Sequence, residues 1–337
     1  MTPEIFIKRQ CNALQVQRIE VIQSLWSGYG EIARYRMNTS ADLSLSTLIV
    51  KHCRMPSVIQ HPRGWQSAHA HQRKVTSYKV EQFGYQHYLS QPCNQARIAR
   101  CYGAFTDQKS AERLLLLEDL RASGFEEDYD GENRDYLLAC IDWLANFHAS
   151  FLYDSPPLGW PQGLWEKGTY WHFDTRQEEW QAMAEGELKD QAAALSSALD
   201  NARFKCLVHG DAKVANFCFS VDGKQVAAVD FQYLGGGVGV QDLVYLLGSA
   251  LSESCLQQEL SYLQEHYFQE LARAIMAKGE NQAFAQQVVD EWQSLFITAW
   301  ADFHRFIMGW SPDHAKNTPL SRQLTAQALE EIRNQAK

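Results

Sequence analysis

A run of eight residues, His209–Asn216, and the later Asp230 carry the side chains with the clearest chemistry in this sequence. The run places a carboxylate at Asp211 and an amide at Asn216, and Asp230 adds a second carboxylate. Phosphoryl transfer needs such groups, because the protein mainly orients a hydroxyl and neutralises phosphate charge through metal ions. We expect Asp211 to accept the proton of a substrate hydroxyl, and Asn216 and Asp230 to hold Mg²⁺ against nucleotide phosphates.

Short apolar runs on either side of these residues predict the strands that position them. The runs cover residues 206–208, 217–219 and 226–229. Asp222-Gly223 lies between the last two, and Asp-Gly between apolar runs is a strong hairpin signal. A hairpin centred there pairs Asn216 with Val229, so Asn216 and Asp230 leave its open end together, about 5 Å apart. Each site residue alone also fits a turn cap, a strand start or a solvated loop, but the triplet in register favours one shared site.

The residues around this hairpin resemble the protein-kinase-like superfamily. The resemblance is greatest to its small-molecule branch, which contains aminoglycoside phosphotransferases, choline kinases and ecdysteroid-kinase-like proteins. The matching segments are residues 207–216, 229–232 and 241–243. Gly210 lies where protein kinases carry Arg, which is typical of the small-molecule enzymes. Asp-Phe-Gln at residues 230–232, in place of Asp-Phe-Gly, resembles the ecdysteroid-kinase-like group in particular.

The resemblance implies an α+β, bilobal protein-kinase-like fold. A small N-terminal lobe with an antiparallel sheet, residues 1–120, would bind the nucleotide and end in the hinge. A larger, mainly helical C-terminal lobe, residues 121–337, would carry catalysis and bind the substrate. The length agrees, because 337 residues exceed the roughly 250–300 that a single core usually supports. The boundary is expected at residues 121–132, where Ala-Ser-Gly and an acidic stretch interrupt the apolar pattern.

The resemblance also implies residues that support the catalytic loop. His209 and Asp242 would stabilise the backbone of this loop. Lys213 lies where many family members carry His, and it either contacts the transferring phosphoryl group or points to solvent. The glycine-rich run Gly235–Gly239 takes the place of the longer activation loop of protein kinases. We therefore expect no regulation by phosphorylation of this loop.

Lys51 and Glu81 are the expected clamp on the nucleotide phosphates. Lys51 ends an alternating, then apolar run over residues 45–51, which resembles the kinase strand whose Lys contacts the α- and β-phosphates. Glu81 lies inside a helical pattern over residues 77–89, with Tyr85 four residues later, as in the family pattern. Each residue also fits a plainer role: Lys51 as a charge at a sheet edge, and Glu81 as an exposed charge on a helix.

A loop that contains Gly28 and Gly30 is expected beside the phosphates. It begins at Ser27 and separates two strands expected at residues 21–22 and 32–37. Glycine in such a loop lets backbone amides approach phosphate. A plain hairpin turn fits the same residues.

Residues 114–120, with four consecutive leucines, read as a buried strand that leads into the hinge. We expect this strand to pair with residues 96–105 through a turn at Asp107. The resemblance implies that backbone groups of Glu118 to Leu120 bind adenine. Any core strand would show the same leucines.

Helical patterns dominate the rest of the chain. Residues 134–152 carry an apolar stripe with helical spacing, and helices return after Gln257. A break at Ser311-Pro312 precedes a last amphipathic helix from about Leu320.

Composition and charge narrow the class of protein. The apolar share of 45% supports a buried core, and the net charge of −9 disfavours a nucleic-acid partner, which needs a basic face. The eight cysteines show no C-x-x-C pair, so they read as thiols of a reducing compartment. The N-terminus has no signal-peptide core, and no run approaches the roughly 20 apolar residues of a membrane span. We expect a cytoplasmic protein, whose oligomeric state the sequence does not set.

Basic and histidine side chains gather between Lys51 and Lys79. We interpret this segment as a mobile basic loop beside the phosphate site. Metal ligation by His69 and His71 is the alternative.

The acceptor should enter between the catalytic loop and the C-terminal helices, a region rich in tryptophan. Tryptophan faces bind quaternary ammonium groups, which suggests a choline-like amino-alcohol, although ordinary core packing explains the same residues. Asp174, Glu178 and Glu179 would instead suit an amino-sugar such as an aminoglycoside, and aromatic rings would suit a sugar or steroid. The sequence does not choose among these acceptors.

Together these features predict an ATP- and Mg²⁺-dependent phosphotransferase that acts on a hydroxyl of a small molecule. Two alternatives stay open. The first is a catalytically silent nucleotide-binding pseudokinase. The second is an enzyme of the same fold that transfers AMP or acts on protein.

Overall fold

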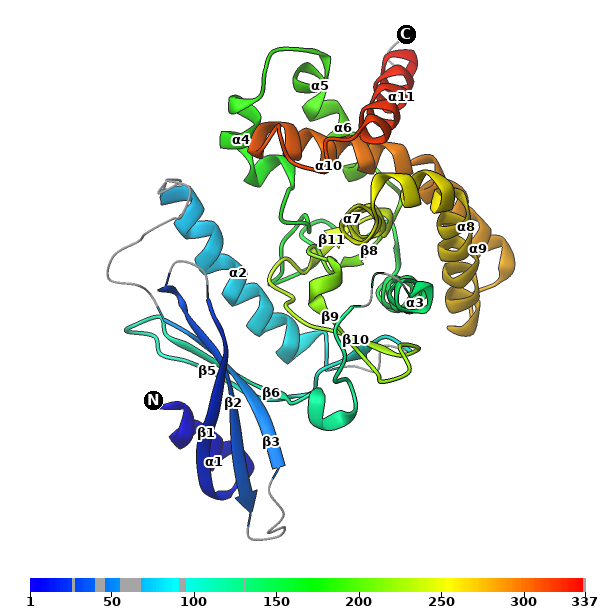
Figure 1. Cartoon of the computed structure of the whole chain (residues 1–337). Coiled ribbons are helices and arrows are strands. Elements are labelled where there is room, and N and C mark those ends of the chain that lie inside the picture. The colour runs from blue at the N-terminus through cyan, green and yellow to red at the C-terminus, as the bar shows by residue number, and fades with distance from the viewer. Residues whose placement is uncertain are drawn as a thin grey trace.

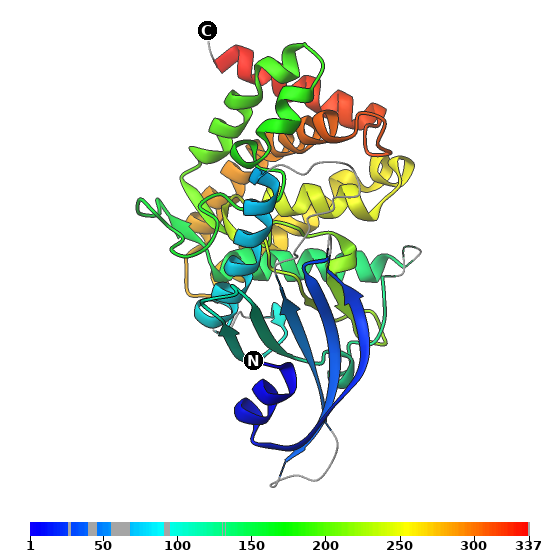
Figure 2. The same cartoon turned by 90° about the vertical axis from the view of Figure 1, so that its left-hand side faces the viewer.

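The computed structural model of the chain describes residues 1–25, 28–39, 46–54, 68–90, 95–129, 131 and 133–335. Ser27, Leu45 and the middle of the basic segment, residues 55–67, lie outside the described residues. An antiparallel sheet forms the N-terminal part, and a mainly helical part follows it, with the two chain ends far apart (Figures 1 and 2). The predicted α+β fold class, with a small sheet lobe and a larger helical lobe, is therefore confirmed.

The N-terminal sheet has the strand order β1-β2-β3-β6-β5, and every neighbouring pair is antiparallel. Its strands are β1 (Ala13–Ser24), β2 (Gly30–Thr39), β3 (Ser46–Cys53), β5 (Cys101–Thr106) and β6 (Arg113–Glu118). The strands predicted on either side of the Gly28 loop are thus present and are longer than expected.

Alternation along the strands assigns the two faces of this sheet, because successive side chains point to opposite sides. One set packs on helix α1 (Pro3–Cys11) in a small core with Phe6 and Ile7. That set comprises Ala33, Tyr35, Leu48, Val50, Leu114 and Leu116. The other set includes Leu115 and Leu117, which join the main core of the molecule. Lys51 belongs to this second set by its position in β3, so its side chain faces the interior.

Helix α2 (Ala68–His87) lies between the sheet and the helical part (Figure 1). The helix predicted over residues 77–89 therefore begins at least nine residues earlier than expected, and residues 68–79 are not the basic loop that we expected. Their sequence is polar and lacks apolar periodicity, so tertiary contacts stabilise this end of the helix. The Nδ1 of His71 bonds the Tyr29 hydroxyl at 2.5 Å, and Arg73 donates to the carbonyl of Thr175 at 3.0 Å.

The strand predicted over residues 96–105 is split in two. Its second half is β5, which pairs with β6 as expected, with a bulge between Cys101 and Gly103. Its first half, β4 (Arg97–Ile98), pairs in parallel with β10 (Val226–Ala228) of the C-terminal part. This pairing joins segments far apart in the sequence, which a local pattern does not reveal.

The C-terminal part is built mainly from helices that pack around one core. Its longer helices are α3 (Arg134–Ser150), α6 (Ala192–Asp200), α7 (Val240–Ala250), α8 (Glu253–Ala277), α9 (Gln282–Ser294), α10 (Phe296–Trp310) and α11 (Pro319–Gln335). Two short helices, α4 (Gln177–Ala182) and α5 (Glu187–Asp190), precede α6. The helix predicted over residues 134–152 and the break after Trp310 are confirmed. No helix among the described residues has both the length and the apolar character that crossing a bilayer requires.

Two small sheets support the segment from residue 204 to residue 237. The first has the order β4-β10-β9, with β9 covering Phe217–Phe219. The second has the order β11-β8-β7 and comprises β7 (Tyr153–Asp154), β8 (Phe204–Val208) and β11 (Gly235–Gly237). The hairpin β9–β10 pairs Phe217 with Ala228, which is the register predicted from the Asp-Gly turn.

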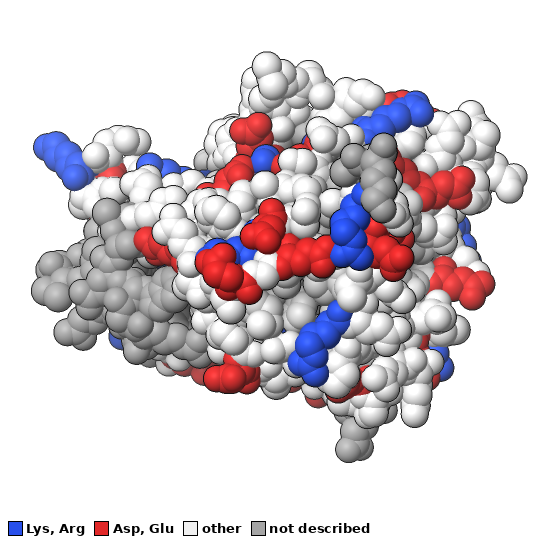
Figure 3. Space-filling view, turned by 90° about the horizontal axis from the view of Figure 1, so that it is seen from above, with Lys and Arg blue, Asp and Glu red and all other residues white. Residues whose placement is uncertain are grey.

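Charged side chains of both signs are mixed on the face that lies above α10 and α11 in Figure 1. Figure 3 shows a band of Asp and Glu across this face, with Lys and Arg side chains between them. The distribution on this face agrees with the net charge of −9.

Candidate active site

The loop that we predicted to be catalytic leaves β8 at Val208 and returns through the short 3₁₀ helix η4 (Val214–Asn216) to β9. Asp242, near the start of α7, fastens this loop. The N–H groups of His209 and Gly210 donate to its two carboxylate oxygens at 2.6 and 2.9 Å. The Nε2 of His148, on α3, lies 3.1 Å from Asp242 Oδ2, and all of these groups are buried.

Asp242 therefore carries much of the stability of the loop, and its replacement by Asn is our first prediction. The amide would turn an NH₂ group toward one buried N–H donor and leave it without a partner. We expect Asp242→Asn to lower the free energy of unfolding by about 2–4 kcal/mol, measured by urea denaturation. Asp290→Asn makes the same chemical change on the exposed face of α9, and there we expect a change within about 0.5 kcal/mol. Equal losses in the two variants would contradict this role of Asp242.

His209 links the catalytic loop to the strand that precedes Asp230. Its Nε2 lies 2.9 Å from the carbonyl of Val229, and its Nδ1 accepts from the N–H of Asp211 at 3.3 Å. Because a carbonyl only accepts, these contacts assign the neutral ring with its proton on Nε2. His209 also packs on Phe231, with ring centroids 4.6 Å apart. The imidazole thus positions both predicted catalytic carboxylates without contacting either one.

The backbone of the loop requires glycine at position 210. Its φ of +80° lies in the left-handed region, and a Cβ there would lie 2.2 Å from the carbonyl oxygen of Tyr233. Any larger residue would push the loop away from the segment after Asp230. The glycine that replaces the Arg of protein kinases is thus fixed by close contact between backbones.

Asp211 is buried and has polar neighbours on two sides. The Asn216 amide donates to its carbonyl at 2.8 Å and to its Oδ2 at 3.2 Å, and Lys213 Nζ lies 3.2 Å from the same Oδ2. The Tyr245 hydroxyl also bonds the carboxylate. Burial raises the pKa of Tyr245, and the nearby Tyr170 and Asp211 raise it further. Burial raises the pKa of Asp211, and Lys213 offsets part of this shift. A raised pKa suits a carboxylate that must take up a proton near neutral pH.

Lys51 joins Glu81 and Asp230 in one buried ion cluster. Its ammonium lies 2.6 Å from Glu81 Oε2 and 2.9 Å from Asp230 Oδ1. Two carboxylates keep the pKa of Lys51 raised although its burial opposes this. The structure therefore brings together three predicted residues from β3, α2 and the segment after β10. A sheet edge for Lys51 and an exposed position for Glu81 are both wrong, since Lys51 is 4% and Glu81 3% exposed.

Asp230 has an unusual backbone conformation. Its φ of +67° lies in the left-handed region, which side chains other than glycine rarely adopt. Although Asp230 is desolvated, Lys51 and Lys74 hold the pKa of its carboxyl well below the usual value, so it stays ionised. The Gln232 amide also donates to Asp230 Oδ1. Strained residues of this kind gather at functional sites, where surrounding contacts hold them.

Gln232 connects Asp230 to helix α2, a role that the sequence did not reveal. Its Oε1 accepts from Lys74 Nζ at 2.8 Å and from the Ser77 hydroxyl at 3.1 Å. The third residue of the Asp-Phe-Gln motif thus fixes the carboxylate through α2. Glycine has no side chain to make these contacts.

Asn216 and Asp230 are the residues that could hold a divalent cation. The N–H of Val229 donates to the Asn216 carbonyl at 2.9 Å, so both residues leave the same end of the hairpin. The bonds of the Asn216 side chain use its nitrogen, and in the described part of the chain its Oδ1 accepts none. An ionised carboxylate and an amide oxygen are hard ligands that fit Mg²⁺.

Contacts within the chain account for part of the glycine loop and the predicted hinge without any nucleotide. A Cβ on Gly30, whose φ is +124°, would lie 1.9 Å from the carbonyl oxygen of His52, so its strand pairing alone requires glycine. Gly28 has φ +77° at the turn between β1 and β2. In the predicted hinge, the N–H of Glu118 donates to the carbonyl of Arg100, and the Leu120 carbonyl accepts from the N–H groups of Ser123 and Phe125. These backbone groups are therefore already bonded within the chain.

Most tryptophans near the expected acceptor side pack in the hydrophobic core. Trp171, Trp292 and Trp300 are buried in it. Trp165 stacks on Tyr233 with ring centroids 6.0 Å apart and donates to the Gln232 carbonyl at 2.8 Å. Packing thus accounts for these four side chains.

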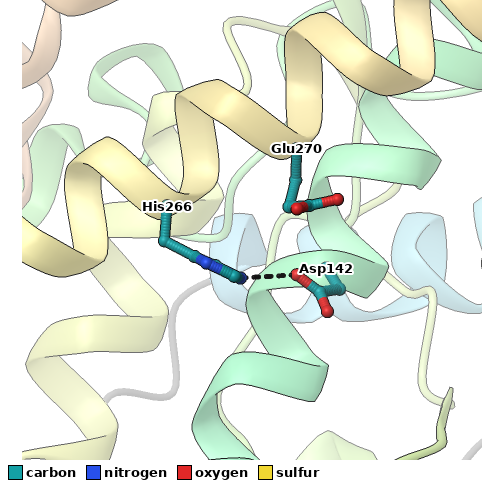
Figure 4. A group of neighbouring side chains, drawn as sticks. All are labelled: Asp142, His266 and Glu270. Atoms are coloured by element: carbon teal, nitrogen blue, oxygen red, sulfur yellow. Dashed lines mark hydrogen bonds and ion pairs between the residues drawn. The ribbon is translucent and has the colours of Figure 1, made fainter.

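A second group of possible metal ligands lies between α3 and α8, on helices outside the catalytic loop (Figure 4). Asp142 Oδ1 lies 2.7 Å from His266 Nε2, while both Glu270 oxygens accept from Arg273 at 2.6 and 2.8 Å. Each member therefore has an ion-pair partner within the chain, and the group ties α8 to α3. Among the described residues, His69 and His71 belong to no group with the spacing of metal ligands.

Comparison with known proteins agrees with this geometry. Residues 167–279 match the ecdysteroid kinase-like family, and this stretch contains the catalytic loop, Asp230 and Asp242. The match confirms the resemblance to the small-molecule branch of protein-kinase-like enzymes. No curated protein matches the sequence.

Several solved structures are similar to the whole chain. A choline kinase from Streptococcus pneumoniae is 13% identical with a TM-score of 0.43, and the match covers 98% of this chain and 97% of that one. An ethanolamine kinase from Plasmodium vivax is 13% identical with a TM-score of 0.45, covering 95% of this chain and 83% of that one. An amicoumacin kinase, solved with AMP-PNP, Ca²⁺ and amicoumacin, is 13% identical with a TM-score of 0.45, covering 99% and 94%.

Proposed function

We propose that this chain is an ATP- and Mg²⁺-dependent phosphotransferase that moves the γ-phosphate to a hydroxyl of a small molecule. The observation that carries the proposal is the contact of Lys51 with both Glu81 and Asp230, at 2.6 and 2.9 Å. His209 links this cluster to Asp211, because its Nδ1 accepts from the N–H of Asp211 and its Nε2 lies 2.9 Å from the carbonyl of Val229, the residue before Asp230. This arrangement supports a site in which Lys51 binds phosphate, Asp230 binds the metal and Asp211 acts as the base.

In this proposal the nucleotide binds to the lobe formed by residues 1–120. Lys51 contacts the α- and β-phosphates, while Glu81 holds its ammonium in place. The backbone around Gly28 and Gly30 lies over the phosphates, and the hinge from Glu118 to Leu120 lies beside adenine. Residues 121–337 form the lobe that carries catalysis and binds the acceptor.

Asp230 and Asn216 would hold the magnesium ion. When bound, the ion neutralises charge on the phosphates and fixes their orientation. The residues fit this role because Asp230 is ionised and the Asn216 Oδ1 accepts no bond from the described residues. Gln232 keeps the Asp230 carboxylate turned toward Lys51.

Asp211 would orient the acceptor and act as the base. Its carboxylate accepts the hydroxyl proton while the hydroxyl oxygen bonds to the γ-phosphorus. The bond between that phosphorus and the β–γ bridging oxygen breaks in the same step, and ADP leaves with the electron pair. Lys213, 3.2 Å from Asp211, can donate to the phosphoryl group as it passes.

A thermal-shift screen tests the function directly, because a bound ligand stabilises the folded state by mass action. Mg²⁺ with AMP-PNP should raise the melting temperature, and EDTA should remove the shift. Amino-alcohols, aminoglycosides, sugars and sterols are then added, and each binder is incubated with ATP. Mass spectrometry should show acceptor plus phosphate. An AMP adduct, or nucleotide binding without Mg²⁺ dependence and without transfer, would replace our proposal by one of the two alternatives.

Lys213 provides a prediction about pH. Its cation favours the ionised form of Asp211, whose pKa burial raises. Without the cation the carboxylate takes up its proton at a higher pH. As the pH is lowered, we therefore expect the kcat of Lys213→Met to fall at a higher pH than the kcat of wild type. A fall at the same pH would show that Lys213 points to solvent and does not act on the base.

A further inference from the structure

Lys316, in the segment between α10 and α11, lies against two aromatic rings of the helical part. Its ammonium stands 4.7 Å from the ring centroid of Tyr245 and 5.3 Å from that of Phe303. The charges that act on it are those of Asp211 and Lys213. The hydroxyl of Tyr245 bonds Asp211, so Lys316 adds a cation that is one aromatic side chain away from the proposed base.

No ion pair neutralises Lys316 within the described ranges, although the side chain is largely enclosed. Burial lowers the pKa of its amine to about 8. A desolvated cation that lacks a counter-ion destabilises the fold unless a partner supplies the charge. The two aromatic rings supply only part of this stabilisation, because a cation–π contact is weaker than an ion pair with a bonded carboxylate. An anion from outside the chain would complete the site.

The surroundings of Lys316 leave room for a ligand. A cavity of about 370 Å³ lies between the end of α7, the start of α8, α10 and residues 314–318. Lys316 forms part of its wall, and so does Glu253, whose Oε1 accepts from the N–H of Leu320 at 2.9 Å. Trp300, Phe303 and Ile307 give it an apolar side. Small-molecule sites are usually about 300–1,000 Å³ and mostly apolar with few polar groups. Lys316 and Phe303 both line the cavity, and the Lys316 ammonium also lies over the ring of Tyr245, whose hydroxyl bonds Asp211. An acceptor held at Lys316 can therefore keep its apolar part in the cavity and extend past Tyr245 toward the base.

Two of the three carboxylates that we expected to receive an amino-sugar pair with cations of the chain. Asp174 pairs with Lys167 at 2.8 Å, and Glu179 pairs with Arg176 at 2.8 Å. By contrast, Lys213 lies 3.2 Å from Asp211, and Lys316 lies over the ring of Tyr245, whose hydroxyl bonds Asp211. This favours an anionic acceptor over an aminoglycoside or a choline-like compound.

Resting on the phosphotransferase function proposed above, we propose that Lys316 determines acceptor specificity by binding an anionic group. The substrate is then a hydroxyl compound that also carries a carboxylate, sulfate or phosphate. Its apolar part occupies the cavity walled by Trp300 and Phe303. Lys316 recognises the acceptor and takes no part in proton transfer.

Matched probes with one scaffold and different charges test this assignment. We would use 3-phenyllactate as the anion, 3-phenyllactamide as the neutral form and phenylalaninol as the cation. Glycerol 3-phosphate and glycerol distinguish a phosphate from a carboxylate ligand. Affinities are measured by thermal shift and calorimetry with Mg²⁺ and AMP-PNP present. The variants are Lys316→Met, which keeps the length and packing of the side chain, and Lys316→Arg, which keeps the charge.

We expect the anionic probes to bind wild type more tightly than their neutral and cationic partners. Lys316→Met should weaken anion binding about tenfold to a hundredfold, the usual effect of losing a charged hydrogen bond. It should leave the neutral probes unchanged, and Lys316→Arg should restore part of the loss. Lys224→Met, on the exposed turn of the β9–β10 hairpin, is the matched control and should behave as wild type.

The inference fails if phenylalaninol binds best, if no anionic probe binds, or if Lys316→Met binds anions as wild type does. The rise in melting temperature with Mg²⁺ and AMP-PNP is measured separately and shows that each variant is folded. Loss of that shift in the wild type would refute the proposed phosphotransferase itself. A normal nucleotide shift with charge-independent acceptor binding would refute only the role of Lys316.

Discussion

Asp211→Asn should lower kcat by about a hundredfold to ten-thousandfold, the usual contribution of a general base. The amide keeps the shape of the carboxylate and can still accept from Asn216, but it cannot take up the hydroxyl proton. Because Lys51 and Asp230 are untouched, the affinity for Mg²⁺ and ATP should stay close to that of wild type. Turnover is measured with an acceptor from the screen, and nucleotide affinity by calorimetry.

The control for this variant is Asp222→Asn, at the exposed tip of the β9–β10 hairpin. It makes the same chemical change in the same supersecondary unit, away from the loop that carries Asp211. We expect its kcat to equal that of wild type. If Asp211→Asn kept wild-type turnover, another group would have to accept the proton, and the assignment of the base would be wrong.

The parts of the site that the sequence predicted are those with local signals. The Asp222-Gly223 turn between apolar runs fixed the hairpin register, because turn chemistry and strand alternation act over a few residues. Lys51 was expected on a strand because its run resembles a kinase strand, and the structure adds that its side chain is buried. These local patterns therefore predicted that Asn216 and Asp230 leave the hairpin at the same end.

The parts that the sequence did not predict depend on contacts between distant segments. The bond of Lys74 to Gln232 joins α2 to the segment after β10 and also helps to explain why α2 begins early. His148 lay on the apolar stripe of a predicted helix, where its bond to Asp242 has no sequence signal. Lys316 is a lone lysine in a loop sequence. For such residues only the fold supplies the partner.

Composition misled us about the basic segment for a physical reason. Residues 68–76 belong to a segment rich in basic and histidine side chains, which we interpreted as a mobile loop beside the phosphate site. In the structure they form the first turns of α2, because contacts such as that between His71 and Tyr29 stabilise a helix that its own sequence does not favour. Tertiary packing commonly overrides weak local propensity in this way.

Asp230→Asn should lower kcat/KM by about a thousandfold or more. A carboxylate that holds a divalent ion against phosphates contributes several kcal/mol to the transition state, and each 1.4 kcal/mol corresponds to about tenfold in rate. Asn is the suitable replacement because it tolerates the left-handed backbone better than most residues, whereas Ala would add strain to the loss of charge. The Mg²⁺ dependence of nucleotide binding, followed by thermal shift with and without EDTA, should disappear in this variant.

Glu81→Gln separates the metal-binding role of Asp230 from its ion pair with Lys51. Both substitutions remove one carboxylate from the same ammonium, at 2.6 Å for Glu81 and 2.9 Å for Asp230. Only Asp230 is expected to touch the ion, so only Asp230→Asn should abolish the Mg²⁺ dependence. Glu81→Gln should weaken nucleotide binding with its Mg²⁺ dependence retained. If the two variants lost that dependence equally, Asp230 would serve Lys51 alone, and the divalent ion would have to bind elsewhere.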